Sequence, residues 1–153
     1  MIKALGLVAA FVLAASSAHA HSHKLKQLEI VHPWCIETGD TAKPVVVSMI
    51  IKNAGSKPDR LLRAAVSNAA KTELRAGVPP DAEGEVIAAI PLGSLSEVNL
   101  KRGGPHILLS GMKKALGAYD SFPMTLTFER SGKIKVEVMV EEKSILAPVK
   151  QQP

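Results

Sequence analysis

The feature that most constrains the fold of this chain is a strict two-residue alternation near its carboxyl end. In residues 134–141 apolar side chains occupy every second position, and residues 124–129 repeat the pattern. Side chains of a β-strand alternate between the two faces of a sheet, so each stretch predicts a strand with one buried face. Ser131-Gly132-Lys133 supplies a turn between them. The resulting hairpin should bury Val136, Val138, Leu126 and Phe128 and expose Lys135 and Glu137.

Further short apolar segments lie upstream, separated by Gly, Pro, Asn or Asp. They are Leu28 to Val31, Pro44 to Lys52, Glu85 to Ile90, Glu97 to Lys101 and His106 to Ser110. The stretch Leu61 to Lys71 mixes helix-favouring residues with the surrounding strand rhythm, and we interpret it as a strand followed by a turn. Many short strands at this spacing favour an all-β sandwich or barrel. With no repeat or interdomain linker, residues 21–153 are expected to form one domain with a frayed tail from Ala147 to Pro153.

The first 20 residues have the layout of a secretory signal peptide. Met1-Ile2-Lys3 is a short positive start, Ala4 to Ala15 is an apolar run, and Ala18 and Ala20 fit an A-x-A cleavage site. The run is shorter than the roughly 20 residues that a membrane-spanning helix needs. We therefore expect cleavage after Ala20, with Ala18 as the alternative, and export to the bacterial periplasm.

Composition argues against several classes of function. The formal charge of +5 includes Lys3, acids are interspersed with the cations, and aromatic residues make up only 3% of the chain. Such a chain is not expected to bind nucleic acid. The lone cysteine, Cys35, has no internal disulfide partner. No G-x-S-x-G, H-E-x-x-H, C-x-x-C or phosphate-binding glycine loop is present, so we do not expect an enzyme.

Several segments, in order, carry a resemblance to one known family. They include His32-Pro33-Trp34, Ile50 to Gly55, Asp59 to Leu62, Thr72-Glu73-Leu74, Val98 to Leu109, Gly111-Met112-Lys113 and Met124 to Glu129. Together they resemble the PCu(A)C copper chaperones over nearly the whole of residues 21–153. The resemblance implies a cupredoxin-like Greek-key β-sandwich with antiparallel strands. It also implies a periplasmic protein that carries Cu(I) and supports its delivery to cytochrome oxidase through that enzyme's assembly components.

The resemblance implies a Cu(I) site of two histidines and two methionines, which are ligands that suit Cu(I). This chain departs from that pattern at three of the four places. Arg75 stands where a histidine is expected, Val86, Ile87 and Ile90 lie where a methionine is expected, and Leu108 replaces the methionine of an H-x-M pair. Only His106 remains, either as a relict copper ligand or as a polar residue at the start of a strand. Arg75 close to His106 would favour an anion over a cation.

A second candidate metal site lies at the expected new amino terminus. Cleavage after Ala20 would leave His21-Ser22-His23 as the first residues. A histidine in third place lets the terminal amine, two backbone nitrogens and an imidazole surround Cu(II) in a square plane. Cleavage after Ala18 would put His21 in third place instead. The alternative interpretation is a polar leader that contains histidines without a metal function.

Other potential ligands are better explained by packing. Cys35 lies between Trp34 and Ile36, and His32 ends the first expected strand. Three hypotheses for function follow. The first is a copper-binding or copper-carrying protein. The second is a metal-free copper-chaperone scaffold that acts as a protein-interaction module, and the third is a copper enzyme that uses His21 with a further imidazole.

Overall fold

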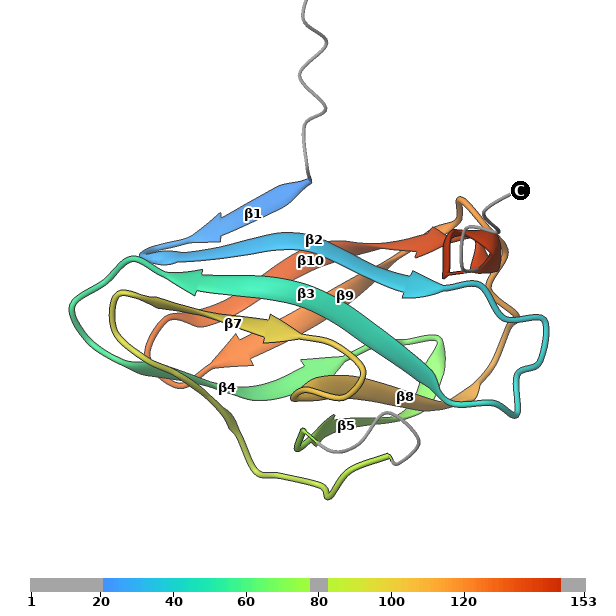
Figure 1. Ribbon diagram of the computed structural model, residues 1–153, viewed down its shortest axis with the longest axis horizontal. Coiled ribbons are helices and arrows are strands. Elements are labelled where there is room, and N and C mark those ends of the chain that lie inside the picture. The colour runs from blue at the N-terminus through green and yellow to red at the C-terminus, as the bar shows by residue number, and fades with distance from the viewer. Residues whose placement is uncertain (1–20, 78–82, 147–153) are drawn as a thin grey trace, which may run out of the picture.

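The computed structural model describes residues 21–77 and 83–146. These residues form ten strands and one short 3₁₀ helix (Figure 1). The strands are β1 (Ser22–Leu25), β2 (Leu28–Ile36), β3 (Val45–Asn53), β4 (Asp59–Ala65), β5 (Ala69–Arg75), β6 (Ile90–Leu92), β7 (Ser96–Leu100), β8 (His106–Met112), β9 (Ser121–Phe128) and β10 (Gly132–Glu141), and η1 (Lys143–Leu146) follows them. None of the helices in this described part is long and apolar enough to cross a membrane.

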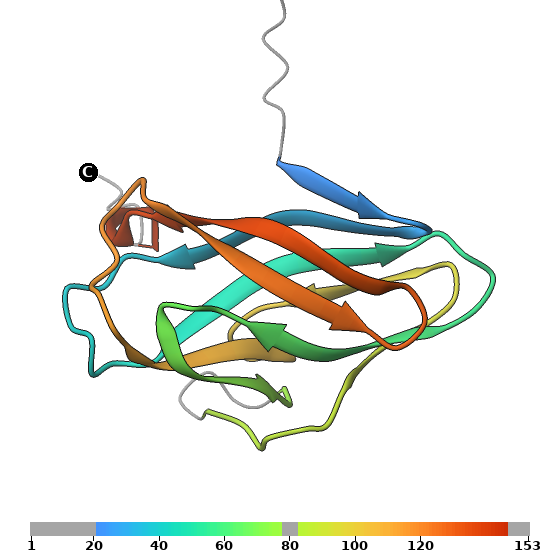
Figure 2. The ribbon, with the colours of Figure 1, turned by 180° about the vertical axis from the view of Figure 1, so that it is seen from behind.

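The strands form one strongly folded sheet in the order β5-β8-β3-β2-β10-β9-β4-β6. One layer holds β2, β3, β7 and β8, and faces the viewer in Figure 1. The other holds β4, β9 and β10 and is in front in Figure 2. β1 pairs with β2, and β7 pairs with β3 beside β8. The expected all-β sandwich is therefore confirmed.

The core lies between these layers and contains the residues that alternation predicted. Val136, Val138, Leu126 and Phe128 are at most 2% exposed, whereas Lys135 and Glu137 are exposed. β9 and β10 pair in antiparallel register from Gly132 opposite Phe128 to Met139 opposite Ser121. The predicted hairpin is thus confirmed, as is the strand followed by a turn in the 61–71 stretch, although the next strand, β5, already begins at Ala69.

The sandwich differs from a wholly antiparallel one in a single pairing among the described strands. β10 runs parallel to β2, with Met139 opposite Trp34 and Glu141 opposite Ile36. Parallel neighbours need a long crossover connection, and the rest of the domain supplies it. β1 and β10 therefore lie along the same edge of β2, β1 against its first half and β10 against its second.

Two local expectations were wrong, and one strand was not predicted. β2 does not end at His32 but continues to Ile36, because an irregularity between Val31 and Trp34 lets the strand bend while it stays paired. The segment 85–90 is not a strand; it makes only a bridge from Val86 to Arg75 before β6 begins. β1 was not expected, because its four residues carry too little apolar alternation.

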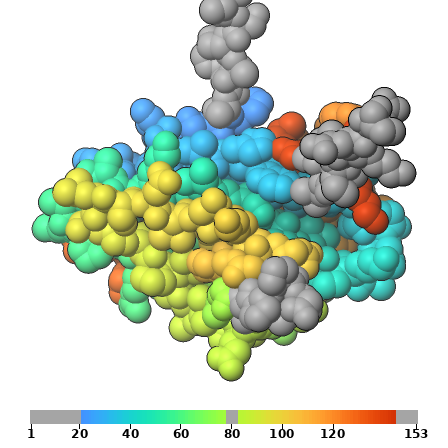
Figure 3. All heavy atoms as spheres, viewed as in Figure 1, coloured from blue at the N-terminus to red at the C-terminus, as the bar shows by residue number. Residues whose placement is uncertain are grey.

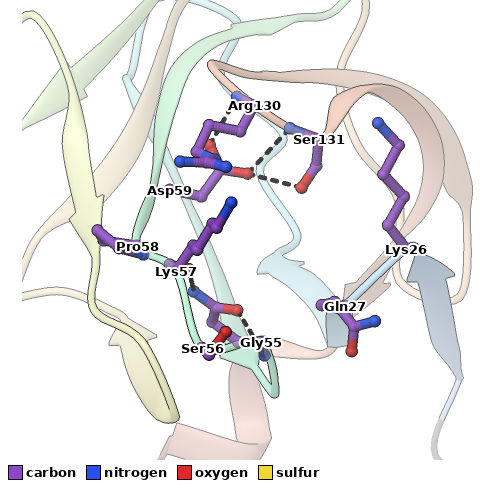
Figure 4. A pocket seen from close by; sticks show the side chains of 10 residues that line it. Lys26, Gln27, Gly55, Ser56, Lys57, Pro58, Asp59, Arg130 and Ser131 are labelled. Atoms are coloured by element: carbon purple, nitrogen blue, oxygen red, sulfur yellow. Dashed lines mark hydrogen bonds between the residues drawn. The ribbon is translucent and has the colours of Figure 1, made fainter.

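A buried carboxylate fixes the end of the sandwich where β4 begins and the β9–β10 turn lies (Figure 4). Asp59 Oδ1 accepts the backbone N–H groups of Arg60 and Arg130, and its Oδ2 accepts the N–H and the hydroxyl of Ser131. Burial alone would raise the pKa of Asp59, but the hydrogen bonds from Ser131, Arg130 and Arg60 hold it below its ordinary value. Asp59 is therefore a structural clamp.

Candidate functional site

His106 begins β8 and is only 2% exposed. Its Nδ1 lies 2.9 Å from the carbonyl oxygen of Gly104, in the tight turn that precedes the strand. A carbonyl can only accept, so in the neutral ring Nδ1 carries the proton and Nε2 keeps the lone pair. This is the arrangement in which a histidine binds a metal through Nε2. The ring of His106 is thus suitable as one ligand.

The neighbours of His106 do not complete a metal site. Alternation along β5 and β8 turns Leu74 and Ile107 into the core and leaves Arg75 and His106 on the opposite face. Arg75 stands directly across from His106 in the register, and Glu73 stands across from Leu108. The register thus places Arg75 and His106 side by side on one face, while the contacts of the guanidinium are with Gly84 and Glu73. A permanent cation beside His106 disfavours a metal ion there, because like charges repel.

Arg75 is held in this position by these two contacts. Its guanidinium donates to the carbonyl oxygen of Gly84 at 2.7 Å and to Glu73 Oε2 at 2.5 Å. Glu73 also pairs with Lys71, and the hydrogen bonds from Lys71 and Arg75 lower its pKa. The Nε of Arg75 is buried without a partner among the described residues. The acid at this site is therefore already neutralised by cations and is not free for a metal.

The amino-terminal histidines lie at the other side of the molecule, on and beside β1 (Figure 1). His21 is exposed, and its carbonyl oxygen accepts the N–H of His32 at 2.8 Å. His23 is half-buried on β1, opposite Ile30, with its Nε2 3.4 Å from the backbone nitrogen of Glu137 on β10. Along an antiparallel ladder, hydrogen-bonded residue pairs alternate with pairs that are not hydrogen-bonded. Since residues 21 and 32 form a hydrogen-bonded pair, the next such pair is His23 with Ile30. The amide of His23 is thus part of the β1–β2 ladder.

His32, which stands across from His21 on β2, is occupied by structural contacts. Its Nε2 lies 2.7 Å from Glu141 Oε1, and its ring stacks on Trp34 with 6.3 Å between centroids. Its backbone has a positive φ of 47°, at the irregularity of β2. These contacts agree with the structural role expected for His32 and tie the end of β10 to β2.

The sulfur-containing residues are placed for packing. Cys35 is 1% exposed, and burial, followed by the charge of Glu141, raises the pKa of its thiol to about 12. A thiol with this pKa is protonated at neutral pH and is a poor metal ligand. Met112 lies in the core at the far end of β8 from His106. Within residues 21–77 and 83–146, no three His, Cys, Asp or Glu side chains are grouped so as to hold a metal ion.

The structure also assembles a surface that the sequence did not reveal. Trp34 on β2, Val46 on β3 and the Lys101-Arg102 turn after β7 line one cavity. Each residue is visible in the sequence, but their proximity depends on the pairing of β2 with β3 and of β3 with β7. No local pattern in the sequence predicts that proximity.

The fold is a β-sandwich, and solved structures identify it as that of PCuAC domains. One is described as an apo PCuAC domain from PmoF1, with 23% identity over 80% of this chain and 99% of that domain and a TM-score of 0.72. Another is a copper-bound PCuAC domain from PmoF2, with 24% identity, coverage of 80% and 98%, and a TM-score of 0.71. The Cu(I) form of DR1885 from Deinococcus radiodurans shares 19% identity over 85% of this chain and 87% of its own, with a TM-score of 0.64.

The family model for LpqE-like lipoproteins matches residues 28–140. The chain belongs to the LpqE-like family. No curated protein matches it. The resemblance to PCu(A)C proteins inferred from the sequence is thus confirmed, and with it the predicted sandwich.

Proposed function

We propose that this protein is an extracytoplasmic copper-binding protein whose metal site lies at a processed amino terminus, at His21 and His23, and not at His106. It acts as a binder or carrier of copper and not as an enzyme. The observation that carries the proposal is the tripeptide His21-Ser22-His23, which stands at the exposed start of β1. There an α-amine, two amides and an imidazole supply the nitrogen ligands that Cu(II) accepts in a square plane.

The region around His106 supports the same assignment, because its described residues lack the donors that a copper site needs. Solved domains of this fold are described as bound to copper or to Cu(I). In this chain Arg75 pairs with the histidine that would serve as a ligand there, and Leu108 lies on the same face of β8. Neither a guanidinium nor a hydrocarbon offers a lone pair to a metal. A copper function in this chain therefore needs another set of donors, and the amino terminus has one.

The proposal includes a place and a partner. Cleavage after Ala20 in the periplasm would create the free amine at His21, and a copper-receiving protein, such as a component of cytochrome oxidase assembly, would take the metal. An exposed terminal site suits transfer between proteins, because a partner's ligands can approach the metal from the open side. Mass spectrometry of the exported protein measures whether the terminus is His21 or His19.

The test is a Cu(II) titration against a competing chelator, on protein with its native processed terminus. His23→Ala should lower the affinity by at least the roughly 100-fold that residues supporting a metal site contribute. His106→Ala is the matched control and should leave the affinity unchanged. One glycine added before His21 moves histidine out of third place and should weaken binding as well. The affinity should fall as the pH is lowered, because the amine, the amides and the imidazole must lose protons to bind copper.

Equal Cu(II) affinity in the intact protein and in a variant lacking residues 21–23 would contradict the proposal. Tight Cu(I) binding that disappears on His106→Ala, with sulfur ligands in the spectrum, would place the site on β8 instead.

A second candidate function is a metal-free binding module that uses the same scaffold. The observation in its favour is Arg75, which fills the space beside His106 with a cation held by Glu73 and Gly84. This candidate predicts that copper-free and copper-treated proteins bind the same ligands equally well.

A further inference from the structure

A cavity of about 830 Å³ opens between the end of β2, the start of β3 and the turn after β7. Figure 3 shows this face, with strands β2 and β3 in blue to teal and the segment around residue 100 in yellow. The cavity's apolar lining includes the outward-facing side chains of Trp34, Ile36 and Val46. Ser48 also lines the cavity. It follows Val47, which pairs with Ile107, so the register places Ser48 opposite His106. The cavity therefore adjoins the β8 region without using its histidine.

The rim of this cavity carries an excess of positive charge. Four cationic and two acidic side chains line it. Lys43 lies 4.0 Å from Asp40, and Glu37 accepts the backbone N–H of Lys143. Lys101, Arg102 and Lys143 have no ion-pair partner within the described part of the chain. An apolar floor below unpaired cations is complementary to a ligand with an apolar body and an anionic head.

A second basic cavity lacks this combination. It has a volume of about 280 Å³ and is lined by Lys26, Lys57 and Arg130 around Asp59 (Figure 4). There the carboxylate of Asp59 already accepts four hydrogen bonds, and the lining is mostly polar residues and turns. The larger cavity has both the volume and the aromatic floor that small-molecule sites share.

The strands below the cavity also argue for a small ligand over an added peptide strand. A peptide that extends a sheet needs an edge with free backbone groups. β2 and β3 are paired on both sides along most of their length, and their mutual pairing ends at Trp34 opposite Ser48. Among the described residues, the edges left free at the cavity are therefore only 35–36 of β2 and 45–47 of β3, which are too short to add a strand. The cavity presents side chains of a sheet face, so its occupant makes contact through apolar packing and charge.

We propose that this cavity is a binding site for a small amphipathic anion, an acyl chain or aromatic group with one carboxylate. Its apolar body packs on Trp34 and Val46, and its carboxylate pairs with Lys101 and Arg102. The site is independent of copper and of the processing of the amino terminus, so it stands or falls separately from the proposed metal function.

The chain's single tryptophan provides the measurement, because Trp34 lines the cavity. Decanoate is titrated into the protein below its micelle concentration while the emission of Trp34 is recorded. Decyltrimethylammonium, which has the same chain length and the opposite charge, is the ligand control. We expect a saturable blue shift with decanoate only, weakened by added salt.

The variant Lys101→Glu/Arg102→Glu should weaken decanoate binding about tenfold, as expected for two exposed charge pairs. Lys133→Glu/Lys135→Glu makes the same change in net charge on the exposed face of β10 and should have no effect. The side chains replaced in the two variants are all exposed. Circular dichroism checks that each variant is folded.

Three outcomes would overturn the proposal. One is the absence of a saturable response to decanoate. The second is equal binding of decanoate and decyltrimethylammonium, which would mean that the rim charges have no role. The third is tighter binding of an acidic peptide such as Ac-Glu-Phe-Asp-Leu-Glu-NH₂ than of decanoate, which would assign the surface to a protein partner.

Discussion

At the start of β8, His106 is buried in a paired strand, with its ring oriented by the Gly104 carbonyl and with Arg75 fixed beside it. At the start of β1, His21 is exposed and His23 is half-buried, with its Nε2 near the backbone nitrogen of Glu137. The β8 region has the rigid geometry of a metal site but one donor. The amino-terminal region has several donors, which the fold holds apart in a strand. Comparing them shows that donors and geometry are separate requirements.

The largest expected effect comes from supplying the missing donors on β8. The variant Arg75→His/Val86→Met/Leu108→Met removes the cation and adds three ligands on the face of His106, since Val86 bridges Arg75 and Arg75 pairs with His106. We expect Cu(I) affinity to rise by more than the roughly 100-fold that supporting residues alone contribute. Competition with a Cu(I) chelator measures it. Arg75→Gln/Leu108→Ala, which removes the same side chains without adding donors, is the control and should gain little. An equal gain in both would show that Arg75 repels copper and that donors are not what is lacking.

The sandwich itself could be predicted, because its strongest signals are local. The alternation of apolar and polar residues in β9 and β10 can be seen directly in the sequence, and its apolar residues form part of the core. β1 and the bend in β2 could not be predicted, since they depend on partners. Ser22–Leu25 becomes a strand only because β10 leaves the first half of β2 free to pair with it.

The β8 region could be predicted in part. The sequence named Arg75 and Leu108 as replacements, and the register places both on the face of His106. The contacts of Arg75 with Gly84 and Glu73, and the cavity on Trp34, depend on segments distant in sequence. Side-chain proximity across strands follows from register, which a single sequence specifies only where one face is strongly apolar.

A smaller effect is expected from Asp59, which lies among the turns lining the smaller cavity and contacts neither histidine region. Asp59→Asn replaces an acceptor by a donor that faces Ser131, and should destabilise the domain by about 1–3 kcal/mol in denaturant unfolding. Folding lowers the pKa of Asp59 from 3.8. The ionised carboxylate therefore contributes fully to the stability of the domain above pH 3.8. This contribution is lost as the pH falls through the lower folded-state pKa.

The Asp59→Asn substitution should therefore also flatten the stability of the domain against pH in that acidic window, while Cu(II) affinity at neutral pH stays as in the unaltered protein. A change in Cu(II) affinity equal to that of His23→Ala would mean that the amino-terminal site depends on the whole sandwich and not on the first residues alone.

The smallest expected effect concerns the competition between copper and β1. Chelation by the tripeptide takes the amide of His23 out of its ladder pair with Ile30, so at least the first half of β1 must leave β2. Losing one or two such hydrogen bonds costs about 1–2 kcal/mol. A synthetic peptide of residues 21–27 should therefore bind Cu(II) about tenfold more tightly than the intact protein. Leu25, which packs against the core at the end of β1, anchors the strand.

Leu25→Ala weakens that anchor and should raise the protein's Cu(II) affinity a few-fold towards that of the peptide, with faster exchange of the His23 amide proton as an independent readout. Leu95→Ala is the matched control, because Leu95 is 75% exposed and lies outside β1. If peptide, protein and Leu25→Ala variant bind equally, β1 does not compete with copper, and the metal is held without the His23 amide. The imidazoles and the terminal amine would then be the whole ligand set, and the affinity would depend less steeply on pH, since fewer protons are released per copper bound.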